Sequence, residues 1–171
     1  GEILVINNIK SFNGFFVKPL VEKKFNLPTF QGNDANCFAL GETYYGAGRT
    51  YKNLVGITLG TGLGSGVVVN GQLVYGHDGF AGEMGHTTVY QGGRLCGCGK
   101  KGCLEAYVSR GGIIKTYEEL SGKKNVDLYP VHIAEMANNG DEIAIKTFEK
   151  TGEILGFKLA DAVCLTSPKA F

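Results

Sequence analysis

The sequence predicts an α/β protein in which a β-rich, glycine-rich region is followed by a series of helices. Strand-forming residues dominate residues 54–59 and 65–69, whereas the second half of the chain places apolar residues at helical spacing. The chain has 171 residues, 43% of them hydrophobic, so it can bury a hydrophobic core. Its length fits one domain or one and a half. A disordered chain is excluded, and a mixed fold is expected.

The first 50 residues predict an alternation of strands and helices. The expected strands cover residues 3–7 and 29–31, and the expected helices cover residues 15–25 and 35–45. Asp34 would cap the second helix, and Gly46, Gly48 and Arg49 would form a loop after it. Polar residues therefore follow a strand at a strand-to-helix junction, which is where ligand sites lie in open α/β sheets.

Three antiparallel strands and then several helices are expected in the rest of the chain. A glycine turn at residues 60–64 separates the first two strands, and Asn70-Gly71 predicts a hairpin turn before a third strand at residues 72–75. Residues 76–102 are rich in glycine without a sustained period, which favours an ordered functional loop. Helices are expected at residues 104–109, 113–120 and 131–138, and a long one after Asp141 with Ala144, Phe148, Leu155, Leu159 and Ala162 along one face.

Charge and hydropathy exclude several classes of partner. Lys and Arg number 17 against 16 Asp and Glu, a net charge of +1, so neither nucleic acid nor an anionic membrane is an expected partner. The apolar stretches are broken by glycines well short of the roughly 20 residues of a membrane span. We therefore expect a soluble, cytoplasmic protein. Because the sequence starts at Gly1 and ends shortly after a helical pattern, we also expect it to be a segment of a longer protein.

Three of the five cysteines, Cys96, Cys98 and Cys103, lie within eight residues. An odd, clustered set argues against a secreted disulfide framework and favours metal binding in a reducing compartment. Together with His86, these residues provide the ligands of a tetrahedral structural zinc site. The alternative is three buried or free thiols, but a glycine-rich loop offers no core in which to bury them.

Gly60, Gly62, Gly64 and Gly66 alternate, so the backbone could approach a phosphate and present its N–H groups to it. Thr61 adds a hydroxyl donor. A dinucleotide-binding fingerprint is disfavoured, because that motif opens a helix, whereas a Val-Val-Val strand and an Asn-Gly turn follow here. A merely tight hairpin remains the alternative.

Several carboxylates are candidates for binding a ligand's hydroxyl groups. Asn33 and Asp34 lie at the strand-to-helix junction, although an Asp there is more often only a helix N-cap. Glu83 precedes His86 by three residues and Glu105 follows the last clustered cysteine by two, so a folded loop would bring them together. Isolated loop glutamates are usually solvated, but a ring of Asn, Asp, two Glu and a His suits the hydroxyls of a sugar.

Taken in order, these motifs resemble the ROK family (repressor, open reading frame, kinase). The run Leu54 to Val67, the segment Gly82-Glu-Met-Gly-His86 and the segment Cys96 to Glu105 resemble its central signature and its zinc motif. Asn33-Asp-Ala-Asn36, with Gly41-Glu42, resembles its catalytic stretch. The similarity therefore spans residues 33–105.

The resemblance implies an actin/hexokinase-like (ribonuclease H-like) fold of two lobes with a sugar in the cleft between them. Residues 1–50 would form part of the first lobe, and residues 51–171 much of the second. Asp34 would be the general base, the hydroxyl-binding residues would be Asn33, Glu83, His86 and Glu105, and Gly60, Thr61 and Gly62 would bind ATP phosphates. One ring nitrogen of His86 would bind zinc and the other would face the sugar.

The implied reaction is phosphorylation of a hexose by ATP and Mg²⁺, with glucose to glucose 6-phosphate the first choice. N-acetylmannosamine, N-acetylglucosamine, fructose and allose are the alternative substrates. The family also contains sugar-responsive transcriptional repressors, but the Gly-Thr-Gly turn favours a kinase. The family's amino-terminal Asp-x-Gly-Gly-Thr turn and carboxy-terminal adenosine loop are not in this sequence, so we expect the segment alone to be inactive. The resemblance also implies that the full-length enzyme is a homo-oligomer, a dimer.

Overall fold

The chain forms two units, Gly1–Asn33 and Asp34–Phe171, in the computed structural model, which describes residues 2–3, 10–124 and 127–171. In the first unit, strands β1 (Glu2–Ile3) and β2 (Phe15–Phe16) pair antiparallel, and a 3₁₀ turn, η1 (Lys10–Phe12), and helix α1 (Val17–Phe25) complete it. The lobes expected on either side of residue 50 remain a prediction.

Part of what the sequence predicts for the first unit is wrong. The predicted helix 15–25 begins two residues later, at Val17, because Phe15 and Phe16 form strand β2, which pairs with β1. Only Ile3 of the predicted strand 3–7 is described, and residues 4–7 lie outside the described residues. The predicted strand 29–31 is irregular backbone, because the Thr29 N–H donates to the Glu22 side chain (3.1 Å) rather than to a neighbouring strand.

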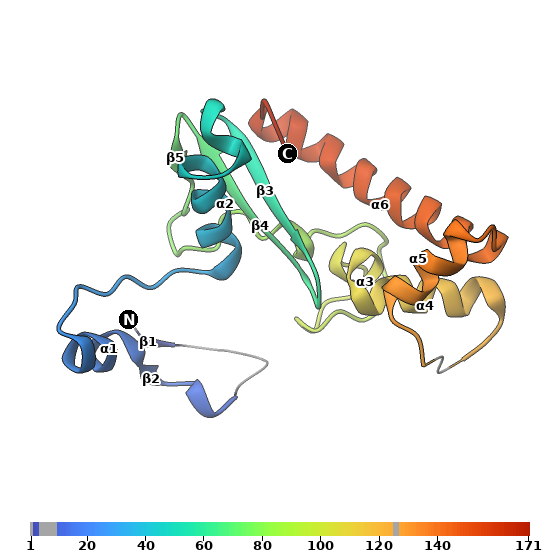
Figure 1. Ribbon diagram of the computed structural model, residues 1–171, viewed down its shortest axis with the longest axis horizontal. Coiled ribbons are helices and arrows are strands. Elements are labelled where there is room, and N and C mark those ends of the chain that lie inside the picture. Colours follow the sequence, from blue (N-terminus) through green and yellow to red (C-terminus); the bar gives the residue numbers. More distant parts are fainter. Residues whose placement is uncertain (1, 4–9, 125–126) are drawn as a thin grey trace. The chain divides into compact units, whose positions relative to one another are not determined.

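The sheet of the second unit has three antiparallel strands in the order β3–β4–β5 (Figure 1). They are β3 (Leu54–Leu59), β4 (Leu63–Val69) and β5 (Gln72–Leu73). Leu59 pairs with Leu63, so Gly60–Gly62 forms the tight turn, and Asn70 and Gly71, with φ of +52° and +77°, form the second turn. The antiparallel succession is confirmed, although β4 begins two residues earlier than predicted and β5 is shorter.

Helix α2 (Asp34–Tyr44) packs on one face of this sheet through small residues. A Cβ atom added to Gly64 would come within 2.7 Å of the Ala35 Cβ, and one added to Gly66 within 2.7 Å of the Ala39 Cβ. Alternate residues of a strand share a face, so these two glycines both lie under the helix. The predicted loop after α2 is instead the 3₁₀ turn η2 (Ala47–Thr50).

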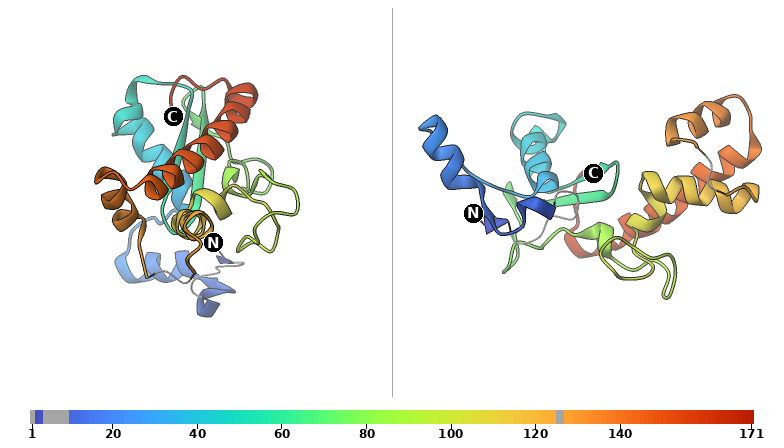
Figure 2. Two further views of the ribbon diagram at one scale, coloured as in Figure 1. Left: turned by 90° about the vertical axis from the view of Figure 1, so that its right-hand side faces the viewer. Right: turned by 90° about the horizontal axis from the view of Figure 1, so that it is seen from below.

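The other face of the sheet, near its tight turn, packs against the helical half of the unit. Leu63 forms one buried cluster with Leu104, Tyr107, Val108 and Ile154. The helices of this half are α3 (Glu105–Val108), α4 (Arg110–Ser121), α5 (Pro130–Asn138) and α6 (Glu142–Thr166), and the cluster takes residues from α3 and α6. Figure 2 shows α4 and α5 at the end of this unit away from α2, and α6 running from that end back toward the sheet.

All four predicted helices of this half are present, with boundaries shifted by at most three residues, and the predicted cap of α6 is confirmed. The Asp141 Oδ1 accepts a hydrogen bond from the Ala144 N–H (2.8 Å). After α6 the chain returns to β3, where the Val55 N–H donates to the Ala170 carbonyl (3.1 Å) in a parallel bridge. None of the helices in the described part of the chain is long and apolar enough to cross a membrane.

Candidate functional site

His86, Cys96, Cys98 and Cys103 converge as the sequence predicts, with their ligand atoms within 4.8 Å of one another. The Cys98 and Cys103 sulfurs are 3.7 Å apart, and the Cys96 sulfur lies 3.7 Å from the His86 Nδ1. A tetrahedral zinc with Zn–S bonds of about 2.3 Å would set the sulfurs about 3.8 Å apart, so the spacing and the donor set both fit that metal.

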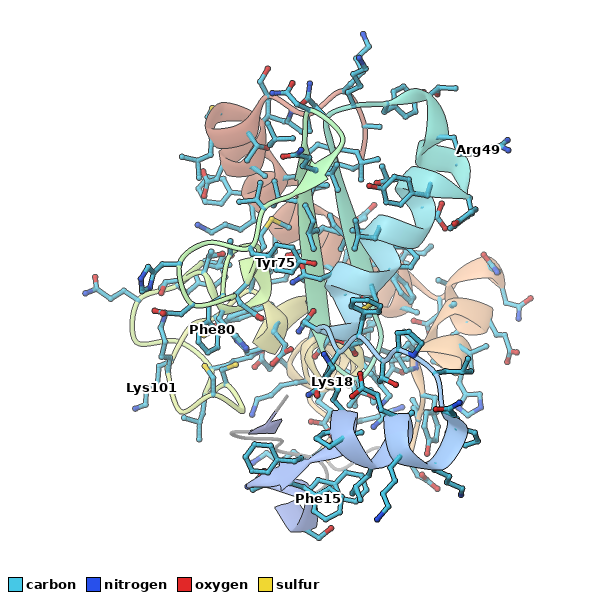
Figure 3. All side chains as sticks on the ribbon, turned by 90° about the vertical axis from the view of Figure 1, so that its left-hand side faces the viewer. Phe15, Lys18, Arg49, Tyr75, Phe80 and Lys101 are labelled. Carbon is cyan, nitrogen blue, oxygen red and sulfur yellow. The ribbon has the colours of Figure 1, made fainter. Side chains whose placement is uncertain are left out.

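The turn that carries the thiols is folded by its own backbone. The Cys96 N–H donates to the Lys100 carbonyl (2.8 Å), and the Gly99 N–H donates back to the Cys96 carbonyl (3.0 Å). Gly99 and Gly102 have φ of +88° and +83°, which residues with a Cβ rarely adopt. Lys101, labelled in Figure 3, marks this turn. The glycines between the sulfurs therefore make the convergence possible.

The pKa shift differs from one thiol of the cluster to the next. Burial raises the pKa of the Cys96 thiol to about 12, and burial also raises the pKa of Cys103. A backbone hydrogen bond from Lys100 lowers the pKa of the exposed Cys98. A metal must displace protons from the two buried thiols, so its binding would release protons and weaken in acid.

Arg94 connects the loop that carries the cysteines to helices α3 and α4, a role that the sequence analysis missed. Its guanidinium donates to the carbonyls of Ala106 (3.2 Å) and Gly112 (3.0 Å) and to the Glu119 carboxylate (2.7 Å). It also lies over the Tyr107 ring, 4.6 Å from the centroid. The only sequence signal was an arginine two residues before the first clustered cysteine.

Glu105 joins the cluster of His86 and three cysteines to the tight turn of the sheet. Its Oε2 accepts a hydrogen bond from the Leu63 N–H (2.9 Å), and its Oε1 lies 3.4 Å from the Cys96 sulfur. The side chain is only partly buried. One carboxylate thus contacts both the β3–β4 turn and the thiol cluster while part of it stays accessible to a ligand.

The segment with Glu83 and His86 is held against strand β4. The Ser65 hydroxyl donates to the Gly82 carbonyl and accepts from the Met84 N–H (3.2 Å), so it spans the peptide groups on either side of Glu83. His86 ends the 3₁₀ turn η3 (Met84–His86) with its Nδ1 toward Cys96, and Glu83 is exposed. The Cys96 sulfur lies near both His86 and Glu105, whereas the predicted approach of Glu83 to Glu105 stays a prediction.

Asp34 is the first residue of α2, and not the cap that precedes the helix. Its side chain is exposed, and its Oδ1 accepts from the adjacent Ala35 N–H (2.9 Å). Because Ala35 packs on Gly64, the start of α2 lies near the tight turn of the sheet. Asn33 is the last residue of the first unit, so its predicted role beside Asp34 stays a prediction.

The tight turn itself borders a pocket of about 570 Å³ lined by Gly60, Thr61, Arg110, Phe148 and Gly152, among others. The turn is closed by the Gly60 N–H, which donates to the Gly62 carbonyl (3.0 Å), and by the Arg110 N–H, which donates to the Gly60 carbonyl (2.9 Å).

The interpretation of all four alternating glycines as phosphate-binding needs correction. Gly64 and Gly66 are covered by α2, where they make room for Ala35 and Ala39. Only Gly60, Thr61 and Gly62 lie at the tight turn, where a ligand could reach the backbone.

Comparison with known proteins agrees with these features. A model of the ROK family matches residues 1–171. The chain belongs to the ROK family. A glucokinase of Halalkalibacterium halodurans is 38% identical over 167 residues, covering 91% of this chain and 51% of the relative. A xylose repressor of Bacillus spizizenii is 33% identical over 154 residues, covering 90% of this chain and 39% of the relative.

Among solved structures, the ROK glucokinase of Streptomyces griseus in complex with glucose and AMPPNP matches this ROK chain with a TM-score of 0.87 and 34% identity. The match covers all of this chain and 59% of that one. The family and the hexokinase-like fold class predicted from the sequence are therefore confirmed. The chain spans about half the length of its glucokinase relatives.

Proposed function

We propose that the protein phosphorylates a hexose with ATP, and that glucose is its substrate. The observation that carries this proposal is the Glu105 carboxylate, which accepts a hydrogen bond from the first residue after the Gly60–Gly62 turn and lies beside the His86 and cysteine cluster. Groups suited to sugar hydroxyls thus adjoin a turn suited to phosphates. The similarity to glucokinases, one of them solved with glucose and AMPPNP, supports both assignments.

The chemical step assigned to this chain is proton removal by Asp34. The oxygen of one sugar hydroxyl would bond to the γ-phosphorus, ADP would leave, and the hydroxyl proton would pass to the Asp34 carboxylate. Asn33, Glu83, His86 and Glu105 would orient the sugar, and the N–H groups and hydroxyl of Gly60, Thr61 and Gly62 would contact the ATP phosphates, which also bind Mg²⁺. Phosphoryl transfer depends mainly on such positioning.

We assign a structural zinc ion to His86, Cys96, Cys98 and Cys103. The ion would fix the glycine-rich loop and the orientation of the imidazole. With Nδ1 directed at the thiols, the His86 Nε2 is the nitrogen that would face the sugar. The zinc would therefore act on sugar binding through the position of His86.

The test is a phosphorylation assay of a full-length enzyme carrying this segment, with ATP and a panel of glucose, N-acetylmannosamine, N-acetylglucosamine, fructose and allose. We expect glucose to give the highest kcat/KM. If another sugar gives a higher kcat/KM, that sugar and not glucose is the preferred substrate. ATP consumption that no sugar stimulates would refute the kinase assignment.

A sugar-responsive repressor is the second candidate, because a xylose repressor matches 90% of this chain. Sugar binding without phosphorylation, together with a DNA-binding domain in the full-length protein, would support it. The Gly60-Thr61-Gly62 turn favours the kinase, since a protein that only senses sugar does not need a phosphate site.

A further inference from the structure

Gly62 lies directly under the Glu105 carboxylate. A Cβ atom added to Gly62 would overlap the Glu105 Oε2 and would lie 3.2 Å from its Cδ. At Gly60, two residues earlier in the same turn, an added Cβ would meet nothing within 4 Å. The two turn glycines therefore face different surroundings, and only Gly62 is crowded by another residue.

Backbone conformation does not explain the glycine at either position. Neither Gly60 nor Gly62 is among the described residues with positive φ, so an L-residue could adopt either backbone conformation. What Gly62 provides is space, and the group that occupies this space is the Glu105 carboxylate.

A backbone hydrogen bond fixes the carboxylate from a second direction. The Leu63 N–H donates to its Oε2 (2.9 Å), and the Cys96 sulfur lies 3.4 Å from its Oε1. A carboxylate held by a backbone N–H keeps one orientation, and a binding group that is already oriented loses less conformational freedom when its ligand arrives.

From these contacts we infer that Gly62 is a positioning residue for sugar binding, acting through the orientation of Glu105. This inference rests on the proposed role of Glu105 as a ligand of the sugar. The glycine turn would then have a second role beside phosphate contact, because it holds the sugar-binding carboxylate of Glu105 in one orientation.

The test compares Gly62→Ala with the matched control Gly60→Ala in a full-length enzyme. Glucose affinity is measured by calorimetry without nucleotide, so that contacts to phosphate cannot contribute. We expect Gly62→Ala to weaken glucose binding about tenfold or more, the cost of one lost charge-assisted hydrogen bond. Gly60→Ala should leave glucose affinity unchanged, whatever it does to the KM for ATP. Equal glucose affinities in the two variants would overturn the inference.

Glu105→Ala separates this inference from the proposed function. If Glu105→Ala leaves glucose affinity unchanged, Glu105 is not a sugar ligand, and both its proposed role and the inference about Gly62 fail. If it weakens glucose binding, Gly62→Ala should add nothing further in the Glu105→Ala background, because the displaced carboxylate is already gone. Additive losses in the double variant would refute positioning while leaving Glu105 as a ligand.

A measurement at Leu63 keeps the inference testable if Gly62→Ala fails to fold. Hydrogen exchange of the Leu63 amide should be at least about tenfold faster in Glu105→Ala than in the unmodified enzyme, since the carboxylate is its acceptor. Unchanged exchange at Leu63 would mean that the turn does not hold Glu105 in solution, and the inference would fall.

Discussion

Asp34 begins helix α2 with an exposed side chain, and its proposed role as a base can be separated from a purely structural one. In a full-length enzyme, Asp34→Asn should lower turnover by about a hundred- to ten-thousandfold while glucose affinity survives, because an amide keeps the hydrogen bonding but cannot take the proton. Asp141→Asn is the matched control: Asp141 caps α6, and Asn caps a helix as well as Asp does. Near-normal turnover of Asp34→Asn, measured by coupled assay, would leave Asp34 as only a helix-terminal residue.

The Arg94–Glu119 ion pair should contribute stability that depends on pH. The hydrogen bond from Arg94 lowers the pKa of Glu119 below its ordinary value of 4.5. The pair therefore stabilises the fold above pH 4.5, and this contribution is lost as the pH falls through the lowered pKa. Because Glu119 is about half exposed, Glu119→Gln should cost only about 0.5–1 kcal/mol in free energy of unfolding at pH 7. Denaturant titrations should show this difference vanishing in acid, and a constant difference would contradict the prediction.

The convergence of His86 and the three cysteines could be predicted from the sequence, and the residues that support this cluster could not. Close spacing of thiols among glycines is a local signal, so His86 and the three cysteines needed no tertiary information. Arg94 and Ser65 act through contacts with residues 12 to 25 positions away along the chain. No periodicity or spacing marks such contacts before the fold is known.

Helix α2 and the sheet should be sensitive to a single methyl group between them. Gly66→Ala would press a Cβ to 2.7 Å from the Ala39 Cβ, so we expect it to destabilise the protein by about 1–3 kcal/mol. Gly156→Ala is the control, because Gly156 is exposed in α6 with nothing within 4 Å of an added Cβ. That substitution should stabilise the protein by about 0.8–1 kcal/mol through helix propensity. The measurement is thermal unfolding of both variants. A change in melting temperature of the same sign in both would contradict the packing interpretation.

The loop from Gly76 to Gly102 should depend on zinc for its order. We expect one zinc per chain, lost in the double variant Cys98→Ser/Cys103→Ser and kept in Cys37→Ser/Cys164→Ser, whose cysteines lie outside the cluster. Metal analysis after refolding with zinc gives the stoichiometry. Zinc affinity should fall as the pH falls, because the buried thiols must lose protons to bind. Equal zinc content in the two double variants would refute the site.

The elements were more predictable than their packing. The antiparallel strands and the cap of α6 follow from local turn and cap residues. The alternating glycines were misassigned because a packing glycine and a ligand-binding glycine look alike until the partner helix is placed. The predicted apolar face of α6 was incomplete for the same reason: Ala144 and Ala162 are buried and Phe148 and Leu155 pack against buried clusters, but Thr147 and Ile154 are buried with them. Which face is covered depends on α3, α4 and α5.

The fold of the chain does not by itself separate a kinase from a repressor. Both a glucokinase and a xylose repressor match about nine-tenths of it. Function therefore has to be argued from the site, and the features that favour the kinase are the Gly60-Thr61-Gly62 turn and the exposed Asp34.

The 171 residues alone should show no measurable sugar-dependent ATP consumption, even if they fold and bind zinc. The segment holds one phosphate turn, the candidate base and the sugar-binding residues, whereas the two other nucleotide-binding segments expected from the family are not in this sequence. Without them ATP and Mg²⁺ would not be held in line with the sugar hydroxyl, and that positioning supplies most of the catalysis. Large apolar side chains such as Phe157 and Leu165 are exposed on α6, so the isolated segment should also tend to self-associate. A coupled assay with glucose, run beside a full-length enzyme at equal concentration, is the measurement. Turnover near the full-length rate would show that the nucleotide is held entirely by the residues described here.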